Sequence, residues 1–331
     1  MIWHGMDPAQ LEQAAQCLAR GQLLGFPTET VYGLGADASQ DEAVRGIYAA
    51  KGRPIDHPLI VHIAQAEDAT HFADPIPDFA RTLMSAHWPG PLTLILPRRP
   101  HVAEVCAAGQ TSIGLRCPSH PVALALLRAA RRLGVKGIAG PSANRFGRVS
   151  PTRASHVVDE FGTQLPVLDG GPCSVGIESS IVDCTRGQPI LLRPGMLDAA
   201  ILSHTLGREI LNPKQAGDAG LATAPKASGT LASHYAPDAR VILLEVAAMD
   251  LRASGLSPEA LSGVAVWSPQ PPRFKAGFWR AMPQQPSDCA QQLFGVLRDF
   301  ENAKATEIWV CPPPPGPAWD GVRDRLTRAS H

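Results

Sequence analysis

The amino-acid sequence predicts an α/β protein with a large N-terminal domain and a smaller C-terminal one. Helical and strand patterns alternate from residue 8 to residue 195, as expected of a layered α/β domain. Residues 212–233 are rich in Gly, Ala, Pro and Lys, lack a sustained period and are predicted to be a linker. Strand and helix patterns then resume, and their alternation predicts a small parallel sheet. A chain of 331 residues is long enough for both domains to bury a core.

The elements of the N-terminal domain follow from local patterns. An apolar stripe from Leu11 to Leu18 predicts a helix ahead of a short strand, Leu23 to Phe26. A loop rich in hydroxyl groups and glycine is expected from Thr28 to Gly35, and the helix after it delivers Lys51 and Arg53. Further strands are predicted at Leu59–Ile63, Leu92–Leu96, Ile113–Arg116, Gly137–Gly140, Ser180–Asp183 and Ile190–Leu192, and further helices at Pro121–Leu133 and Asp198–Leu206.

The C-terminal part shows the same alternation on a smaller scale. Its predicted strands are Val241–Val246, Gly263–Trp267 and Glu307–Cys311, and its predicted helices are Asp288–Ala303 and Trp319–Ala329. We therefore place the N-terminal domain at residues 8–200, the linker at 201–238 and the C-terminal domain at 239–331.

Composition excludes several classes of protein. The formal net charge is zero, so global charge gives no reason to expect a nucleic-acid or membrane partner. The seven cysteines include no C-x-x-C pair, which argues against a disulfide framework or a zinc site. The N-terminus has no signal-peptide pattern, and no apolar run approaches the length of a membrane span. We expect a cytoplasmic protein with no membrane contact.

One part of the chain is strongly basic. Residues 91–153 contain ten basic residues and one acid, Glu104, which is a local charge of +9. The stretch is either a set of solvated helix faces or a positive face for a nucleotide or RNA. Phe146 is its one aromatic residue, so recognition by base stacking receives little support.

Lys51 and Arg53 are candidates for binding phosphate. They lie two residues apart at the predicted end of a helix, where solvated cations that suit the helix dipole are the ordinary alternative. Pro54 fixes the chain as it leaves the helix and would hold both cations at a rigid corner. The chain has no G-x-x-x-x-G-K-[ST] loop, so a nucleotide would have to be held in another way.

Ser142 and Asn144 follow the predicted strand Gly137–Gly140, where open α/β sheets bind ligands. The alternative is an ordinary turn or helix cap. Arg116 ends another predicted strand and is a candidate for binding a carboxylate. His57 and His62 do not have metal-ligand spacing on a helix, and no Ser–His–Asp or Cys–His set is evident.

Five motifs occur in the order found in the YrdC-like family: Thr28-Glu-Thr-Val-Tyr-Gly-Leu, Lys51-Gly-Arg53-Pro, Leu59-Ile-Val-His62, Ser142-x-Asn144 and Ser150-Pro-Thr152. The chain resembles the long, two-domain threonylcarbamoyl-AMP synthases of this family over most of residues 8–195. The tract from Gly229 to Pro237 resembles their linker, and Gly321 to Leu326 is the best match in the C-terminal domain. The resemblance implies a YrdC-like twisted mixed sheet with helices, linked to a smaller Rossmann-like α/β domain.

The resemblance also implies a reaction. L-threonine, bicarbonate or CO2, and ATP are joined to give L-threonylcarbamoyladenylate and pyrophosphate. A partner enzyme complex then transfers the threonylcarbamoyl group to tRNA, which yields threonylcarbamoyladenosine. The threonine amine attacks the carbon source and the carbamate attacks the α-phosphate, so no protein nucleophile is required. Mg²⁺ would come with ATP rather than be held by dedicated protein ligands.

Roles for individual residues are carried over from the family's motifs. The residues implied to bind L-threonine are Thr30, His62, Arg116, Ser142 and Ser179, with Arg116 on the carboxylate. Those implied to bind ATP are Lys51, Arg53, His57, Ser112, Asn144, Thr152, Arg193 and Tyr235, with Tyr235 closing over the nucleotide from the linker. Lys51 and Arg53 are the predicted catalytic residues, since they would stabilise charge on the reacting phosphate. No metal ligands are predicted.

The chain departs from the family pattern at three positions. Ser180 stands where Thr is common, Ser228 where Pro is common, and Ser233 where a more basic residue is common. The last two lie in the linker and bear on how Tyr235 closes over ATP.

Two other hypotheses are considered. The first is a non-catalytic factor that binds tRNA or double-stranded RNA, or assists ribosome assembly, through the basic stretch. An intact threonine pocket argues against it, because an RNA binder has no need of His62 and Arg116 together. The second is a carbamoyl-transfer domain of the hydrogenase-maturation type, which the absence of zinc-finger cysteines argues against.

Overall fold

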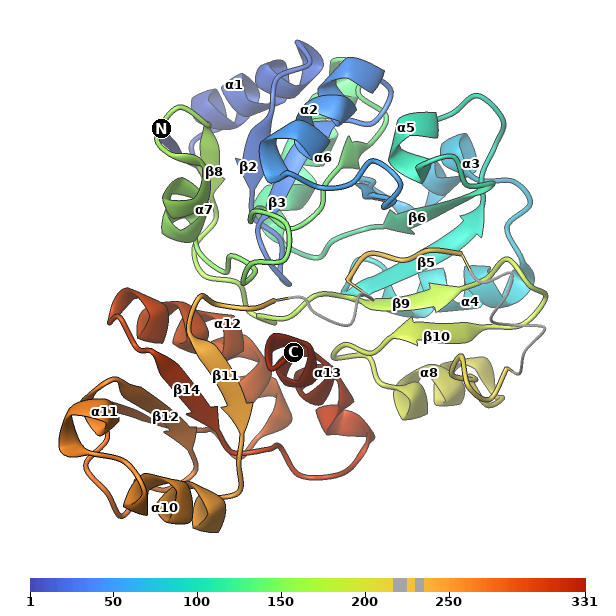
Figure 1. Cartoon of the computed structure of the whole chain (residues 1–331). Helices are drawn as coiled ribbons and strands as arrows, with labels where there is room; N and C mark the ends of the chain where they lie inside the picture. The colour runs from blue at the N-terminus through green and yellow to red at the C-terminus, as the bar shows by residue number, and fades with distance from the viewer. Residues whose placement is uncertain (217–224, 230–234) are drawn as a thin grey trace.

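The computed structural model describes residues 1–216, 225–229 and 235–331 and shows two α/β units (Figure 1). The first unit contains a mixed ten-stranded sheet with the strand order β1-β8-β2-β3-β7-β4-β6-β5-β9-β10. This arrangement confirms the predicted fold class. In chain order the strands are β1 (Ile2–His4), β2 (Leu24–Phe26), β3 (Gly33–Asp37), β4 (Ile60–His62), β5 (Leu92–Pro97), β6 (Ser112–Arg116), β7 (Ile138–Ala139), β8 (Val167–Asp169), β9 (Ser180–Asp183) and β10 (Ile190–Arg193).

The helices of this unit cover the sheet. α1 packs against α6, and α4 packs against α8. Of these helices, α3, α4, α5 and α7 were not predicted from the sequence, and neither were strands β1 and β8. The helices are α1 (Pro8–Ala19), α2 (Asp41–Lys51), α3 (Ala69–Phe72), α4 (Asp78–His87), α5 (Glu104–Ala107), α6 (Pro121–Arg132), α7 (Ala154–Phe161) and α8 (Ala199–Leu206).

The middle of the sheet positions the site. β4 runs parallel to β6 and antiparallel to β7. In this register His62, the last residue of β4, is the direct partner of Arg116, the last residue of β6. Two side chains that are 54 residues apart in the chain therefore emerge side by side at the carboxyl ends of parallel strands.

The predicted loop from Thr28 to Gly35 is wrong in its second half, because Gly33–Asp37 forms the buried strand β3. Glycine is required there by close packing rather than by a turn. A Cβ atom on Gly33 would lie 2.6 Å from Cε1 of Phe26, and one on Gly35 would lie 3.0 Å from Ile138. The ring of Phe26 thus fills the face that a strand side chain would otherwise occupy.

The second unit has a four-stranded, all-parallel sheet with the order β11-β14-β12-β13. The predicted strand Val241–Val246 is too long, because Val246 already begins helix α10. Strand β13, whose four residues are exposed, was not predicted. The elements are β11 (Arg240–Leu243), α10 (Val246–Ser254), α11 (Pro258–Ser262), β12 (Val264–Ser268), β13 (Phe278–Ala281), α12 (Pro286–Asn302), β14 (Glu307–Val310) and α13 (Asp320–Ala329).

The two units share one apolar cluster. Val31, Val149 and Ile177 of the first unit are buried with the core of the second, which is built around Trp267 and Trp309. α12 and α13 lie between the two sheets in Figure 1. The predicted linker, residues 201–238, includes most of α8 and Ser228, whereas residues 217–224 and 230–234 of it lie outside the described residues.

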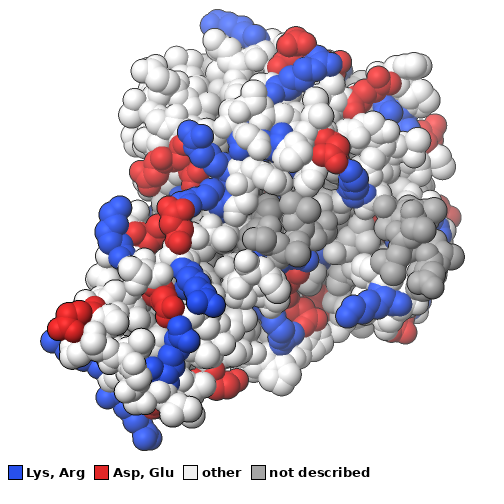
Figure 2. Space-filling view, in the orientation of Figure 1, with Lys and Arg blue, Asp and Glu red and all other residues white. Residues whose placement is uncertain are grey.

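The basic stretch does not form a continuous positive face. Six of its ten cations form ion pairs with carboxylates: Arg98, Arg99, Arg116, Arg131, Arg132 and Arg148. Basic and acidic side chains alternate over the face in Figure 2. The RNA-binding hypothesis therefore receives no support from this stretch. Within the described part of the chain, no helix has the length and hydropathy of a membrane span.

Candidate active site

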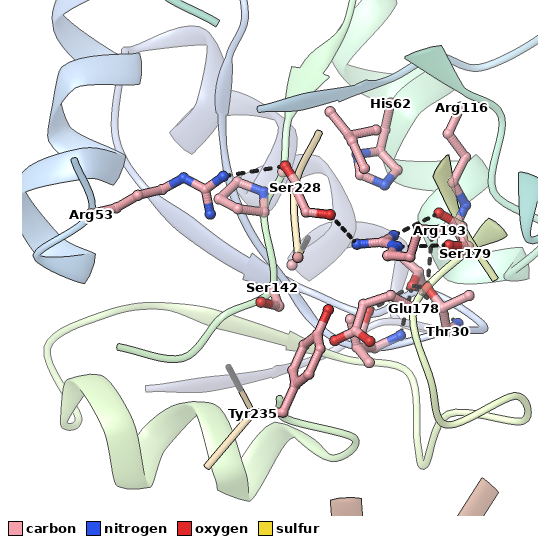
Figure 3. A pocket seen from close by; sticks show the side chains of 17 residues that line it. Thr30, Arg53, His62, Arg116, Ser142, Glu178, Ser179, Arg193, Ser228 and Tyr235 are labelled. Atoms are coloured by element: carbon pink, nitrogen blue, oxygen red, sulfur yellow. Dashed lines mark hydrogen bonds between the residues drawn. The ribbon is translucent and has the colours of Figure 1, made fainter. Parts of the chain in front are cut away.

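A cavity opens at the carboxyl ends of β4 and β6 (Figure 3). It comprises about 530 Å³ of empty space, including its open mouth. All five residues that were assigned to L-threonine line it: Thr30, His62, Arg116, Ser142 and Ser179. Arg53, Arg193 and Tyr235, which were assigned to ATP, line it as well.

Arg116 is the centre of a buried polar network. Its Nη1 donates to Oγ1 of Thr30 at 2.7 Å, and its Nε donates to the carbonyl of Gly90 at 3.2 Å. Its Nη2 lies 2.7 Å from Oε1 of Glu29. A guanidinium carries five N–H donors, so donors remain for a ligand carboxylate. Burial tends to raise the pKa of Glu29, but the charge and hydrogen bond of Arg116 outweigh it and lower that pKa.

The loop that carries Thr30 is held by its own hydroxyls. Oγ1 of Thr28 accepts from the backbone N–H groups of Thr30 and Val31, at 3.2 Å each, and lies 2.8 Å from Oγ1 of Thr30. Such local side-chain to backbone bonds stabilise tight turns, which is why hydroxyl residues suit this position. The turn places the Thr30 hydroxyl between Arg116 and the cavity.

His62, beside Arg116, and Ser142 also line the cavity. His62 packs edge-on against Phe26, and among the described residues its Nδ1 has no hydrogen-bond partner. Ser142 forms an isolated β-bridge with Gly33, which holds the segment after β7 against β3. Both side chains line the cavity and are available to a polar ligand.

Ser179 and Arg193 are held to each other. Nε and Nη2 of Arg193 donate to the carbonyl and Oγ of Ser179, at 3.0 and 3.2 Å. The Ser179 hydroxyl also lies 2.7 Å from Oγ1 of Thr93 on β5. Arg193 is thereby fixed with its Nη1 directed at the linker, where it donates to the carbonyl of Ser228 at 2.8 Å.

Ser228 of the linker lies between two arginines, as Figure 3 shows. Arg53 donates to its hydroxyl at 3.2 Å, and Arg193 donates to its carbonyl. Arg53 is buried, also donates to the carbonyl of Pro58, and has its pKa lowered to about 10, chiefly by burial. Two polar atoms of Ser228 thus occupy the place where two arginines converge.

Lys51 lies behind this cavity rather than in its lining. Its Nζ donates to the carbonyl of Ser142 at 2.6 Å and to the carbonyl of Asn144. The side chain is buried, which lowers the pKa of its amine well below the usual value. Lys51 therefore supports the segment from Ser142 to Asn144 from below.

Comparison with known proteins identifies the family. Residues 16–195 match the Sua5/YciO/YrdC family model, described as telomere recombination. Residues 196–331 match the model described as threonylcarbamoyl-AMP synthase, C-terminal domain. This chain belongs to the two-domain Sua5 family. A threonylcarbamoyl-AMP synthase of Pyrococcus abyssi is 42% identical over 233 residues, which cover 70% of this chain and 67% of the relative.

Two further comparisons agree. A Bacillus subtilis threonylcarbamoyl-AMP synthase is 43% identical over 244 residues, which cover 72% of this chain and 67% of the relative. The crystal structure of Pyrococcus abyssi Sua5 complexed with L-threonine superposes with a TM-score of 0.88 and 33% identity. The match covers 100% of this chain and 96% of that one. Both domains of the Sua5 architecture are therefore present here.

Besides Lys51, four residues that the resemblance assigned to ATP do not line this cavity: His57, Ser112, Asn144 and Thr152. Ser112 lines a neighbouring cavity that shares Ile60 and Ser228 with the main one. His57 lies beside it, with its ring against Phe146. The Asn144 amide donates to the carbonyls of Arg145 and Arg148, and the Thr152 N–H donates to His156. Oδ1 of Asn144 has no hydrogen-bond partner among the described residues, and the roles of Asn144 and Thr152 in binding ATP stay predictions.

Four polar residues at the site were not assigned from the sequence, and one of them is Thr28, which lines the cavity. Glu29 pairs with Arg116. It was not assigned, although it lies inside the Thr28 to Leu34 motif. Glu178 and Ser228 line the cavity. Glu178 directly precedes Ser179, which was assigned, whereas Ser228 stood out only as a departure from the family pattern. The Sua5 motifs thus contained a signal for Thr28 and Glu29, while the positions of Glu178 and Ser228 depend on tertiary contacts.

The burial of His62 predicts how the free energy of unfolding depends on pH. Burial and the charge of Arg116 lower the pKa of His62 to about 3, from a usual 6.5. The unfolded chain therefore binds one more proton than the folded chain at pH values between these two. The free energy of unfolding must fall as the pH drops below 6.5, by about 1.4 kcal/mol per unit.

We expect the His62→Gln variant to lose about 2 kcal/mol less of its free energy of unfolding between pH 6.5 and about pH 5 than the wild type. Denaturant titration at both pH values measures this difference. The exposed His101, replaced by Gln, is the matched control. Equal losses in the wild type and the His62 variant would contradict the assignment of a buried neutral imidazole.

Proposed function

We propose that this chain synthesises L-threonylcarbamoyladenylate from L-threonine, bicarbonate or CO2, and ATP, with release of pyrophosphate. The observation that supports this proposal is the convergence of the predicted residues. Thr30, His62, Arg116, Ser142 and Ser179 come from five separate parts of the chain and line one cavity. Arg53 and Arg193 face the same space, so an amino-acid subsite and a phosphate subsite adjoin.

On the amino-acid side, Arg116 would bind the threonine carboxylate with the N–H groups that its present partners leave over. Glu29 keeps the guanidinium in place and balances its charge when no ligand is bound. His62, neutral at physiological pH, and the hydroxyls of Thr30 and Ser142 would bind the amino or hydroxyl group. A neutral imidazole leaves the threonine amine free to lose its proton and become a nucleophile.

On the nucleotide side, Arg53 and Arg193 would bind the phosphates, and Ser228 must leave the place between them. The neutral threonine amine attacks the carbon of CO2, and one nitrogen proton is released to water as the carbamate forms. Attack on bicarbonate gives the same carbamate with loss of one water molecule. A carbamate oxygen then attacks the α-phosphorus, the bond to the β-phosphate oxygen breaks, and pyrophosphate leaves with the electron pair. Catalysis rests on orientation and on cations around the reacting phosphate.

Mg²⁺ is implied by this family's use of ATP. The carboxylates near the cavity indicate how the ion would be held. The carboxylates at the cavity, Glu29 and Glu178, are each paired with an arginine. Among the described residues no group of three or more His, Cys, Asp or Glu side chains comes together. These residues do not form a protein-held magnesium site, and we propose that the ion arrives with the phosphates of ATP.

The wider setting is also a proposal. An adenylate of this kind is a mixed anhydride, and a second enzyme must consume it before water does. We propose that a tRNA threonylcarbamoyl-transferring enzyme complex does so, and that both proteins act in the cytoplasm.

Pyrophosphate release from ATP tests the function. We expect release that requires both L-threonine and bicarbonate and is not supported by D-threonine. The carboxylate, the amine and the side-chain hydroxyl must meet their partners at the same time, and the D-enantiomer can match only two of the three. Release that is independent of threonine would overturn the proposal.

A further inference from the structure

Arg325 of α13 connects the C-terminal unit to the candidate active site. It is completely buried, at 0% exposure. Its Nε donates to Oε2 of Glu178, a cavity-lining residue of the first unit, at 2.9 Å. The other carboxylate oxygen of Glu178 accepts from the hydroxyl of Ser150. Glu178 is therefore held from both sides.

The rest of the guanidinium holds two backbone segments. Nη2 of Arg325 donates to the carbonyl of Glu178 at 3.1 Å, and Nη1 donates to the carbonyl of Pro194 at 2.7 Å. Glu178 directly precedes Ser179, and Pro194 directly follows Arg193. The two segments fixed by Arg325 thus carry one residue of the threonine subsite and one of the phosphate subsite.

Arg325 also faces the linker tyrosine. Its Cζ lies 5.5 Å from the centre of the Tyr235 ring, which is a cation–π arrangement. The ring of Phe294, on α12, lies 5.4 Å from the same tyrosine. Tyr235 has a φ of 65°, an unfavourable value for a residue with a side chain, so packing from both helices must maintain it. Figure 3 shows its hydroxyl directed into the cavity.

Two glycines let the helices approach these segments closely. A Cβ atom on Gly176 would lie 2.4 Å from Cα of Gln291 on α12. One on Gly321 of α13 would lie 2.9 Å from Ile177 and 3.0 Å from the carbonyl of Gly195. The residues just before Glu178 and just after Arg193 are therefore in direct contact with the C-terminal unit, and small adjustments there are costly.

We propose that Arg325 is a positioning residue of the active site, through which the C-terminal unit holds Glu178, Ser179, Arg193 and Tyr235 in their catalytic geometry. The inference rests on the proposed function and adds a role for the second domain. Arg325 touches no substrate in this arrangement. It acts through Glu178 and two backbone carbonyls. This role gives a reason for the family match at Gly321 to Leu326, the segment that contains Arg325.

The charges around Glu178 make this role measurable. The groups that face it are Arg325 and Asp324 of α13, Arg193 of β10, Tyr235 of the linker and Lys51 of α2. Burial tends to raise the pKa of Glu178, and the charges of Arg325 and Arg193 keep it low. Without the charge of Arg325, burial raises the pKa of Glu178 with less opposition. The carboxylate would then take up a proton at a higher pH than in the wild type.

The experiment compares full-length variants in the threonine-dependent release of pyrophosphate. Arg325→Met is expected to lower kcat/KM roughly 10- to 100-fold, as displaced catalytic groups do, and to shift the acid limb of the pH profile to higher pH. Arg325→Lys, which keeps the charge but not the fork of donors, is expected to recover the pH profile and only part of kcat/KM. Arg323→Met, in the same helix but paired with Asp320 at the surface, is the matched control and should behave as the wild type.

Glu178→Gln combined with Arg325→Met covers the case in which the single variant does not fold. The double variant removes both charges of the buried pair, and Asp324 keeps its ion pair with Arg328, so the variant should fold. It is expected to lack the shifted acid limb and to keep a kcat/KM below that of the wild type. Wild-type kcat/KM and pH profile in a folded Arg325→Met or double variant would overturn the inference. Loss of threonine dependence in the wild type itself would overturn the proposed function instead.

Discussion

Replacing Arg116 by Met is expected to lower kcat/KM for L-threonine by about 10³, the largest effect of any single change in the cavity. Arg116 is the buried cation of the amino-acid subsite, and methionine cannot bind a carboxylate. The change also leaves Glu29 buried without its ion-pair partner, at a cost of about 3–5 kcal/mol of folding free energy. Steady-state kinetics and denaturant titration measure the two effects separately.

The double variant Arg116→Met with Glu29→Gln distinguishes binding from stability. It removes the unpaired charge, so most of the lost free energy of unfolding should return while kcat/KM for threonine stays low. If activity returned together with stability, Arg116 would be a structural residue and the carboxylate would have to bind elsewhere.

Replacing Lys51 by Ala is expected to lower kcat by about 10² or more, in line with the loss of one preorganised charge. Two routes lead to this loss. The ammonium group ties down the carbonyls of Ser142 and Asn144, and it adds positive charge behind the phosphate subsite. Single-turnover release of pyrophosphate at saturating threonine and ATP measures the effect on the chemical step.

Lys226 supplies the matched control for Lys51. It is an exposed lysine of the linker that pairs with Asp56 at the surface and lines the neighbouring cavity. Lys226→Ala should leave kcat nearly unchanged, because an exposed ion pair contributes little. Equal kcat values for Lys51→Ala and the wild type would remove Lys51 from the catalytic residues.

Local patterns predicted most of the fold. Apolar runs marked β2, β4, β5, β6, β9 and β10 close to their observed bounds, because buried strands of a mixed sheet carry few polar residues. Strand β3 was not predicted because its glycines are typical of a loop. They are required instead by the ring of Phe26, which packs directly against them. Strand β13 was not predicted because all four of its residues are exposed, so it lacks the pattern of a buried strand.

The site was less accessible to local reasoning. The residue types near Lys51 and Ser142 suggested phosphate and polar ligands, and the order of the motifs suggested the family. The pairing of His62 with Arg116 depends on strand register, which no local pattern contains. The position of Lys51 behind its loop, rather than in the lining, depends on where the segment after β7 folds.

The contribution of the C-terminal unit could not be predicted from the sequence at all. Arg325 lies 147 residues from Glu178, and a charged residue in an amphipathic helix is normally a solvated one. The tertiary structure alone shows that this arginine is buried and that Glu178 is its partner. Buried ion pairs of this kind are retained at a cost in desolvation, which is consistent with a role beyond stability.

The central claim is that threonine, the carbon donor and ATP react together in this one cavity. Mass spectrometry of the nucleotide product, after incubation with ATP, L-threonine and ¹³C-labelled bicarbonate, tests it most directly. The account predicts an adenylate that carries threonine and one labelled carbon in the wild type, and none in the Arg116→Met, Glu29→Gln double variant. An unlabelled threonyl adenylate, or ADP in place of AMP and its adenylate, would contradict it.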